Sequence, residues 1–485
     1  MPNLTETVNT GIYIGGTERF GTEQLVVRDP ANPDRIIGTA VAATKEDAID
    51  AVQAALAAYP SWSSLSPNER AAQVLASLDA LAADNEENAR ILTSENGKIL
   101  HESIIDLLVF NIRTQLAAGL ADEVDATIEL PGPPMTTTVS FQPLGVVTII
   151  VPFNWPLAIL AASLPYALVA GNTVIVKAPP SAPLAVCRVV QKVAEQLPPG
   201  VLNVISGEDS EMAPLIANDD VAKVSFTGSG GGGRKIMELA SANLTRVTLE
   251  LGGNDAALIL DDAVLDEAAF DLLYGGIFDS TGQVCMAAKR VYVHRSRYDE
   301  LVAGLSARLS STVLGHGLDE ATTMGPLHTA RQKDYVLGLL EEATSTGTEI
   351  LQFGELPTAE GLTEGNFVRP TLVLDPSPHL RVVTEEQFGP IVPIIPFDDE
   401  NEAVAAANDT WGGLCGSVWT ATPARATAIG SKLVCGYVFV NDHGAAHLDL
   451  RAPFGGVRGS GIGREQGIEG IRDFMDTRSI GIPTV

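Results

Sequence analysis

Short apolar segments alternate with helical segments from residue 136 to residue 250, and this alternation limits the possible folds more than any other feature. The apolar runs are TTTVSFQPLGVVTIIV, TVIVKA, VLNVIS and AKVSFTG. Continuous apolar strands separated by helices are typical of βαβ units and a parallel sheet. A second alternating set follows from about 253 to 455. We therefore predict an α/β fold with two parallel layers joined near residue 250.

The segments before this alternation predict amphipathic surface helices. KEDAIDAVQAALAAYPSW (45–62) and NERAAQVLASLDALAADNEENARILTSENGK (68–98) repeat apolar residues at helical spacing and begin at capping residues. At 485 residues the chain is too long for one core, so we expect two or three domains.

The charge balance excludes several classes of partner. The chain carries 31 basic and 60 acidic residues, a formal net charge of −29. Nucleic acids and anionic membranes both favour clustered Lys and Arg, so we expect neither as a partner. The first 16 residues lack the pattern of a signal peptide, and no apolar run reaches 18 residues. With four cysteines in no paired spacing, these features favour a cytoplasmic protein.

The histidines do not predict a metal site. His443 and His447 form the only close pair, in HGAAH, and this pair lacks the glutamate of a zinc-protease helix. We therefore expect no metal.

A glycine-rich segment predicts a phosphate-binding turn. In VSFTGSGGGGRKIMELASA, Gly228, Gly230 and Gly233 satisfy G-x-G-x-x-G between a predicted strand and a predicted helix. Glu250 follows 22 residues after Gly228, so it could bind a ribose as in a Rossmann fold. A poly-glycine run also matches this motif by accident, and a flexible turn with a solvated or ion-paired Glu250 remains the alternative.

Eight motifs, taken together and in order, resemble the aldehyde dehydrogenase superfamily over nearly the whole chain. They are PFNWP (152–156), GNTVIVKAP (171–179), PPGVLNVISG (198–207), FTGS (226–229), LELGG (249–253), GQVC (282–285), EEQFGP (385–390) and PFGGVRGSGIGRE (453–465). The resemblance implies a cofactor-binding domain (1–124 and 145–252), a catalytic domain (253–455), and an oligomerisation arm and tail (125–144 and 471–485). It also implies a homodimer or homotetramer.

The resemblance gives Glu250 a different role and assigns two further catalytic residues. It implies that Cys285 is the nucleophile, that Asn154 stabilises the oxyanion, and that Glu250 is the general base. A thiolate suits aldehyde oxidation because sulfur is strongly nucleophilic, and the resulting tetrahedral carbon can expel hydride. Read alone, Cys285 would more often be a buried core thiol.

The same resemblance implies NAD or NADP as cofactor, with NAD slightly favoured. The implied cofactor-binding residues are Val151, Pro152, Phe153, Lys177, Gly228, Ser229, Gly233, Leu251, Glu386 and Phe388. Many relatives place a glutamate three residues after the lysine, where this chain has Pro180. Because that carboxylate would repel a 2′-phosphate, its replacement predicts that NADP is tolerated.

Other departures concern proton transfer and substrate. Ser163 replaces a lysine that, with the counterpart of Glu465, relays protons in many relatives. The loop 442–452 resembles those of members that accept medium-chain or aromatic aldehydes. Three alternatives remain: release of the thioester to CoA, ester hydrolysis by the same Cys285 and Glu250, and a catalytically silent use of the fold.

Overall fold

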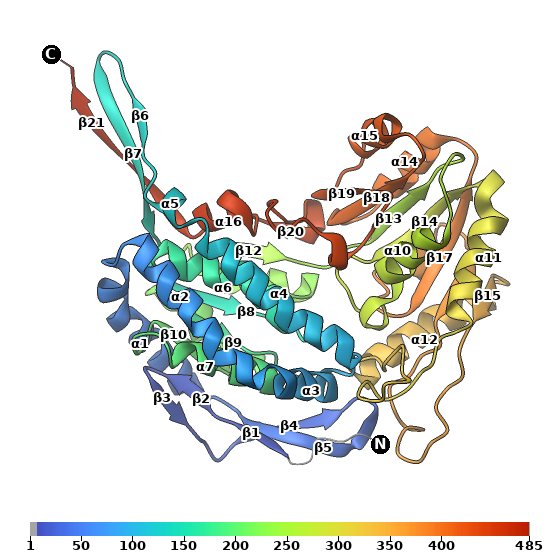
Figure 1. The fold of residues 1–485 in the computed structure, drawn as a ribbon, viewed down its shortest axis with the longest axis horizontal. Helices are drawn as coiled ribbons and strands as arrows, with labels where there is room; N and C mark the ends of the chain where they lie inside the picture. The colour runs from blue at the N-terminus through green and yellow to red at the C-terminus, as the bar shows by residue number, and fades with distance from the viewer. Residues whose placement is uncertain (1–6, 485) are drawn as a thin grey trace.

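The computed structural model describes residues 7–484 and shows two α/β lobes with an arm that projects from the first (Figure 1). This architecture confirms the predicted α/β class. Residues 1–6 and 485, which the predicted cofactor-binding domain and tail include, lie outside the described residues. No helix in residues 7–484 is long and apolar enough to cross a membrane.

The first lobe is built on an eight-stranded sheet whose central five strands are parallel. In spatial order its strands are β20 (Gly461–Ile462), β12 (Arg246–Glu250), β11 (Val221–Thr227), β8 (Val146–Ile150), β9 (Thr173–Lys177), β10 (Leu202–Ile205), β2 (Ile12–Ile14) and β3 (Thr17–Arg19). The chain order reverses between β8 and β11. Ligands of open α/β sheets bind beyond the carboxyl ends of the strands at such a reversal.

Helices cover both faces of this sheet because its central strands are apolar on both sides. One core joins the sheet to α2 (Pro67–Leu81), α3 (Asn85–Asn96), α4 (Leu100–Ala118), α5 (Ala121–Val124), α6 (Pro156–Ala170), α7 (Leu184–Ala194) and α16 (Gly467–Arg472). A second core joins the opposite face to α1 (Lys45–Ser63), α8 (Pro214–Ala217) and α9 (Gly230–Ala240). Neighbouring residues of one strand alternate between these cores, as Val174 and Ile175 do.

The second lobe is a seven-stranded, mostly parallel sheet. Its strands, in spatial order, are β15 (Glu349–Gln352), β16 (Thr371–Leu374), β17 (Ile391–Phe397), β14 (Ala288–His294), β13 (Asp255–Ile259), β18 (Cys415–Trp419) and β19 (Tyr437–Val440). Its helices are α10 (Glu267–Phe278), α11 (Tyr298–Leu309), α12 (Ala330–Ser345), α13 (Arg381–Thr384), α14 (Glu400–Asn408) and α15 (Pro423–Gly430). The linker 251–254 connects the last residue of β12 directly to β13.

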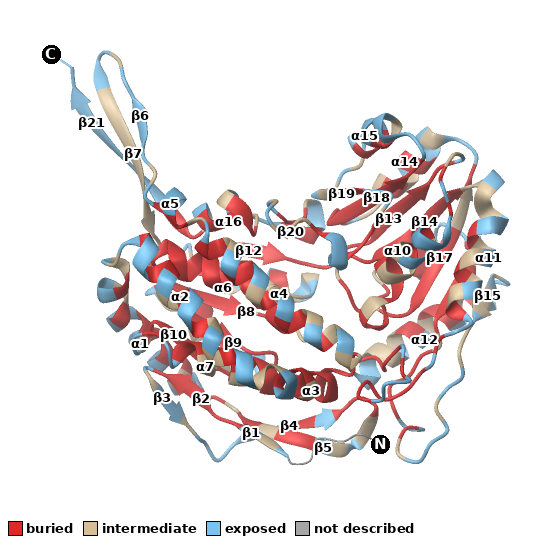
Figure 2. Ribbon diagram, in the orientation of Figure 1, coloured by how far each residue is buried: buried red, intermediate tan, exposed pale blue. Residues whose placement is uncertain are grey.

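Two smaller sheets complete the described fold. β1 (Val8–Thr10), β5 (Asn32–Val41) and β4 (Gln24–Asp29) form one of them. The arm consists of β6 (Ile128–Leu130), β7 (Met135–Pro143) and β21 (Met475–Pro483). Its strands β6 and β21 are largely exposed, and β7 between them is mostly of intermediate burial (Figure 2).

The structure corrects two of the expected elements. The predicted surface helix 68–98 is two helices, α2 and α3, and the end of α3 is buried from Ile91 to Asn96. The predicted β segment 136–151 is two strands in different sheets, because Gly145 adopts a φ of +132° between β7 and β8. Glycine adopts positive φ without steric cost, which allows the chain to leave the arm and enter the first lobe.

Candidate active site

Cys285 lies in the loop that leads from the turn η3 (Asp279–Gly282) into β14. It is partly exposed, whereas Val284 and Met286 on either side are buried. The buried Lys289 ammonium donates to the carbonyl oxygens of Val284 (2.5 Å) and Cys285 (3.3 Å). A cation therefore holds the backbone of this loop.

The surroundings of Cys285 favour the neutral thiol. Burial raises the pKa of Cys285 to about 12, against the effect of the nearby Lys289 cation. Glu386 and Glu250 are close enough to raise this pKa further. The thiol is therefore protonated at neutral pH, and its activation requires a proton acceptor.

Asn154 lies beside the loop that carries Cys285, in the segment between β8 and α6. Its Nδ2 donates to the carbonyl oxygen of Gln283 at 2.8 Å, two residues before Cys285. A side-chain amide carries two N–H groups. Asn154 can therefore hold this loop and also donate to a ligand beside Cys285.

Glu250, the last residue of β12, is a buried acid. Among the described residues, neither of its carboxyl oxygens has a hydrogen-bond partner. The Arg464 guanidinium and the Gly456 backbone N–H lie near enough to lower the pKa of Glu250. Burial first and the charge of Glu465 second raise the pKa of Glu250 well above its ordinary value. A Cβ atom on Gly455 would lie 2.8 Å from Oε1, so glycine lets the backbone approach this carboxyl.

Glu465 connects this acid to a buried polar cluster. Ser163 Oγ donates to Glu465 Oε1 at 2.7 Å and lies 2.9 Å from Ser225 Oγ. Burial raises the pKa of Glu465, while the Ser163 hydrogen bond and the buried Arg113 guanidinium oppose the shift. Ser163, which by the family resemblance replaces a lysine of many relatives, therefore bonds directly to the Glu465 carboxylate.

A buried clamp that the sequence analysis missed holds both the segment that carries Asn154 and the turn before Cys285. Lys98 Nζ donates to Asp106 Oδ2 at 2.6 Å and to the carbonyl oxygen of Asn154 at 3.0 Å. Glu102 Oε1 accepts from the backbone N–H of Ser280 at 2.6 Å, in the turn before Cys285. Glu102 and Asp106, four residues apart, lie on one face of α4, whereas Lys98 precedes that helix by two residues, so helical spacing alone does not identify the whole clamp.

The predicted cofactor residues follow two strands at the sheet reversal. Val151, Pro152 and Phe153 come directly after β8, and Gly228 and Ser229 come directly after β11. The structure therefore brings these five residues to one edge of the sheet, at the reversal where dinucleotides bind in open α/β sheets.

The predicted glycine-rich turn is only partly present. Gly230–Gly233 form the first turn of α9, which Ser229 caps by accepting from the Gly232 N–H at 3.1 Å. Gly233 faces Leu251, and a Cβ atom there would lie 2.8 Å from Leu251 Cδ2. Gly233 therefore serves close packing between helix and linker, and it lies inside α9 instead of at the sheet edge.

The remaining predicted residues divide into two groups. The Glu386 carboxylate lies against the linker, accepting from the Gly253 N–H at 3.3 Å, and a Cβ atom on Gly252 would lie 1.9 Å from Glu386 Oε2. Phe388 contacts Phe153 edge to face at 6.2 Å between ring centroids. Lys177 lies further along the sheet edge, at the end of β9, and forms an ion pair with Asp209.

Two buried histidines are structural neighbours of the site. His443 bonds with Ser417 Oγ (2.8 Å) and the carbonyl oxygen of Met286 (3.0 Å), and burial lowers its pKa to about 4. His328 stacks on Phe153 at 4.2 Å. Within residues 7–484, no three His, Cys, Asp or Glu side chains converge in a way that would hold a metal ion.

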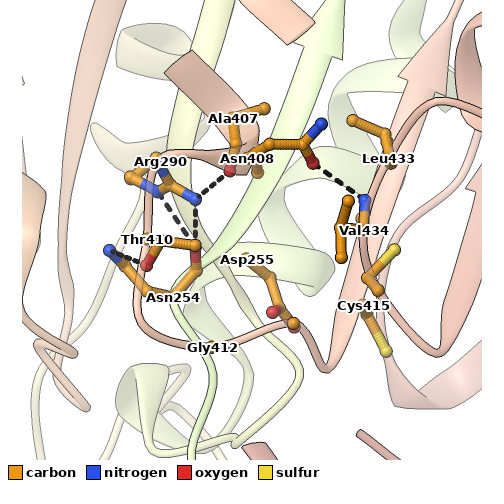
Figure 3. A pocket seen from close by; sticks show the side chains of 14 residues that line it. Asn254, Asp255, Arg290, Ala407, Asn408, Thr410, Gly412, Cys415, Leu433 and Val434 are labelled. Carbon is orange, nitrogen blue, oxygen red and sulfur yellow. Dashed lines mark hydrogen bonds between the residues drawn. The ribbon is translucent and has the colours of Figure 1, made fainter. Parts of the chain in front are cut away.

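A small cavity lies behind the linker, at Asn254 and Asp255, and is also lined by Arg290 and Cys415 (Figure 3). Its volume is about 20 Å³, enough for one water molecule. It is therefore too small for a cofactor or an aldehyde.

Burial raises the pKa of Asp255 to about 7, against the effect of Lys289.

Comparison with known proteins identifies the family that this geometry matches. The model of the aldehyde dehydrogenase family matches residues 18–480. The putative aldehyde dehydrogenase FUS7 of Gibberella fujikuroi is 33% identical over 439 residues, which cover 90% of this chain and 91% of that protein.

Two solved structures share the fold over almost the full length. An NADP-dependent enzyme of E. coli matches with a TM-score of 0.93 and 30% identity, covering 98% of both chains. A betaine aldehyde dehydrogenase of Staphylococcus aureus in complex with NAD+ matches with a TM-score of 0.92 and 33% identity, covering 98% of this chain and 94% of that one.

Proposed function

The chain belongs to the aldehyde dehydrogenase family, and from that premise we propose that it oxidises an aldehyde to the free carboxylic acid with NAD or NADP. One observation carries the proposal. Asn154, Glu250 and Cys285 come from three separate segments, yet Asn154 contacts the nucleophile loop and Glu250 is close enough to affect the thiol.

Attack on the aldehyde begins at Cys285. Once the thiol has passed its proton to the nearby Glu250 carboxylate, sulfur bonds to the carbonyl carbon and the oxygen takes up negative charge. The Asn154 amide and the Cys285 backbone N–H can donate to that oxygen. A well-placed donor of this kind contributes about 3 kcal/mol of transition-state stabilisation.

The residues at the sheet edge fit a nicotinamide dinucleotide. When bound, the nicotinamide supplies the acceptor for the hydride that leaves the substrate carbon. Gly252 has no side chain, so the Glu386 carboxylate can lie against its backbone. Phe388 and Phe153, in edge-to-face contact, offer apolar ring surfaces to the nicotinamide. Ser229 offers its backbone N–H at the start of α9, whereas the Gly228 N–H already donates to the carbonyl oxygen of Glu250 at 3.0 Å.

Release of the product depends on Glu250. Loss of hydride leaves an acyl group on Cys285, and a carboxylate of raised pKa is a suitable base for the water that hydrolyses this thioester. Glu465, held by Ser163, is the acid next to Glu250 and can take up the proton. A buried base at the nucleophile supports water, and not CoA, as the acyl acceptor.

The substrate is best described as an apolar aldehyde of medium chain length or an aromatic one. Cys285 packs in a cluster with Trp155, Leu448 and Leu450, next to buried Met286 and Phe454. Apolar contacts of this kind discriminate weakly between substrates, by about 1 to 3 kcal/mol per methylene. Broad acceptance is therefore expected.

The exposed arm supports assembly into a homodimer or homotetramer.

All four cysteines are free thiols, which supports a reducing, cytoplasmic setting.

The test measures reduced nicotinamide with NAD and with NADP across short, medium-chain, aromatic and acidic aldehydes. Wild type should turn over, and Cys285→Ala should lose at least about 10³-fold in kcat. Cys435→Ala, another partly buried thiol, is the matched control and should keep its activity. Turnover that persists in Cys285→Ala, or requires CoA, would overturn the proposal.

A further inference from the structure

Lys177 and Asp209 form an ion pair that neither strand order nor the family motif predicts. The Lys177 side chain is 2% exposed and the Asp209 side chain is 82% exposed. Lys177 ends β9, and its register partner Ile205 ends β10. Asp209 follows four residues later, so the loop after β10 brings its carboxylate back over the end of β9.

This geometry restores a carboxylate that the sequence lacks at Pro180. We propose that Asp209 and Lys177 together form the binding site of the adenosine ribose, and that Asp209 there selects NAD over NADP. This inference rests on the proposed function. An acidic side chain at that position accepts a hydrogen bond from a ribose 2′-hydroxyl. Lys177 has three N–H donors, so it can hold Asp209 and still donate to a ribose hydroxyl.

The same pair disfavours a 2′-phosphate. A lone lysine would attract that dianion, but Asp209 already balances the charge of Lys177. Glu208 and Glu211 flank Asp209 in the same loop, which makes the local charge negative. A 2′-phosphate would therefore meet like charges at the carboxylate that accepts the 2′-hydroxyl of NAD. The ion pair therefore opposes the tolerance of NADP that Pro180 predicts.

The experiment measures equilibrium binding of NADH and NADPH by fluorescence titration, without any aldehyde. Wild type should bind NADH at least about tenfold more tightly than NADPH. Asp209→Asn should reduce this ratio about tenfold, equal to about 1.4 kcal/mol, mainly through tighter binding of NADPH. Because Asp209 is exposed, the substitution leaves the core intact.

Glu208→Gln is the matched control, since it removes one charge from the next residue in the loop and should leave the ratio within about twofold. An unchanged ratio in Asp209→Asn, an equal shift in both variants, or a wild-type preference for NADPH would overturn the role of Asp209 alone. Binding of neither dinucleotide to wild type would instead defeat the proposed function and this inference with it.

Discussion

At the scale of single residues, the buried carboxyl group of Glu250 suits proton transfer but lowers the stability of the folded chain when it is ionised. Its carboxyl group is buried, and no hydrogen-bond partner exists for it among residues 7–484. Burial and Glu465 favour its protonated form. Because the pKa of Glu250 is higher in the folded than in the unfolded state, the stability contributed by its protonation is fully present below the unfolded pKa. That contribution decreases as pH rises towards the folded pKa.

Glu250→Gln should therefore stabilise the protein while abolishing turnover. Glutamine resembles the protonated acid, so the variant should unfold with about 1 to 3 kcal/mol more free energy at pH 8. The gain should disappear near pH 4, where wild type binds the proton in both states. Denaturant unfolding at the two pH values checks this, with the exposed Glu360→Gln as control. A gain that is equal at both pH values would contradict the burial argument.

Cys285 allows a second test of how burial tunes a reacting group. With a pKa raised to about 12, its thiolate fraction should increase about tenfold per pH unit between pH 7 and 9. Alkylation of Cys285 by iodoacetamide, followed by mass spectrometry, should show the same slope. A rate that levels off below pH 9 would show that the Lys289 cation holds the pKa of the thiol below about 9, against the effect of burial. Cys285→Ser is the control that identifies the modified site.

At the scale of elements, the sequence predicts the strands better than it predicts the contacts that hold the proposed reacting residues in place. Apolar runs such as TVIVKA form central strands because their side chains can be buried on both faces of the sheet. The glycine run after Ser229 is different, because a capped first helical turn and a flexible turn have the same composition. Sequence spacing alone does not reveal that Asp209 pairs with Lys177 or that Glu102 holds Ser280, because these contacts depend on loops meeting in three dimensions.

The clamp on α4 shows how an element without a reacting atom supports the site. Asp106 pairs with the buried Lys98 and also accepts from the backbone N–H of Ala158 at 2.5 Å, near the start of α6. Removing one member of a buried pair leaves the other charge uncompensated, typically at about 3 to 5 kcal/mol. The same change frees the loop that carries Asn154.

Asp106→Asn should therefore lower both stability and kcat. We expect about 3 kcal/mol less unfolding free energy and a kcat reduced by at least tenfold, because Asn154 loses its fixed backbone. Lys235→Met, which breaks the exposed pair with Glu238, is the control and should change stability by less than 1 kcal/mol. A stable Asp106→Asn variant with full kcat would show that the clamp does not position Asn154.

At the scale of the whole molecule, the arm lacks a partner that would cover it in the described chain. β6, β7 and β21 form an antiparallel sheet that projects from the first lobe, with Ile480 and Ile482 53% and 64% exposed (Figures 1 and 2). A small sheet without a covering layer is marginally stable on its own. Exposed strands with apolar side chains are typical surfaces for pairing with another chain.

Disrupting the arm should therefore separate subunits without unfolding the lobes. Wild type should have a light-scattering mass of two or four times 50.9 kDa, and Ile480→Asp with Ile482→Asp should reduce it towards a single chain. Of the residues in the arm strands, Met475 and Phe141 at the base join the core of the first lobe, whereas Ile480 and Ile482 are exposed, so circular dichroism should remain unchanged. Leu244→Asp, which adds a charge at a residue 88% exposed elsewhere on the first lobe, should keep the wild-type mass. If the double variant also keeps that mass, assembly depends on a surface other than these isoleucines of β21.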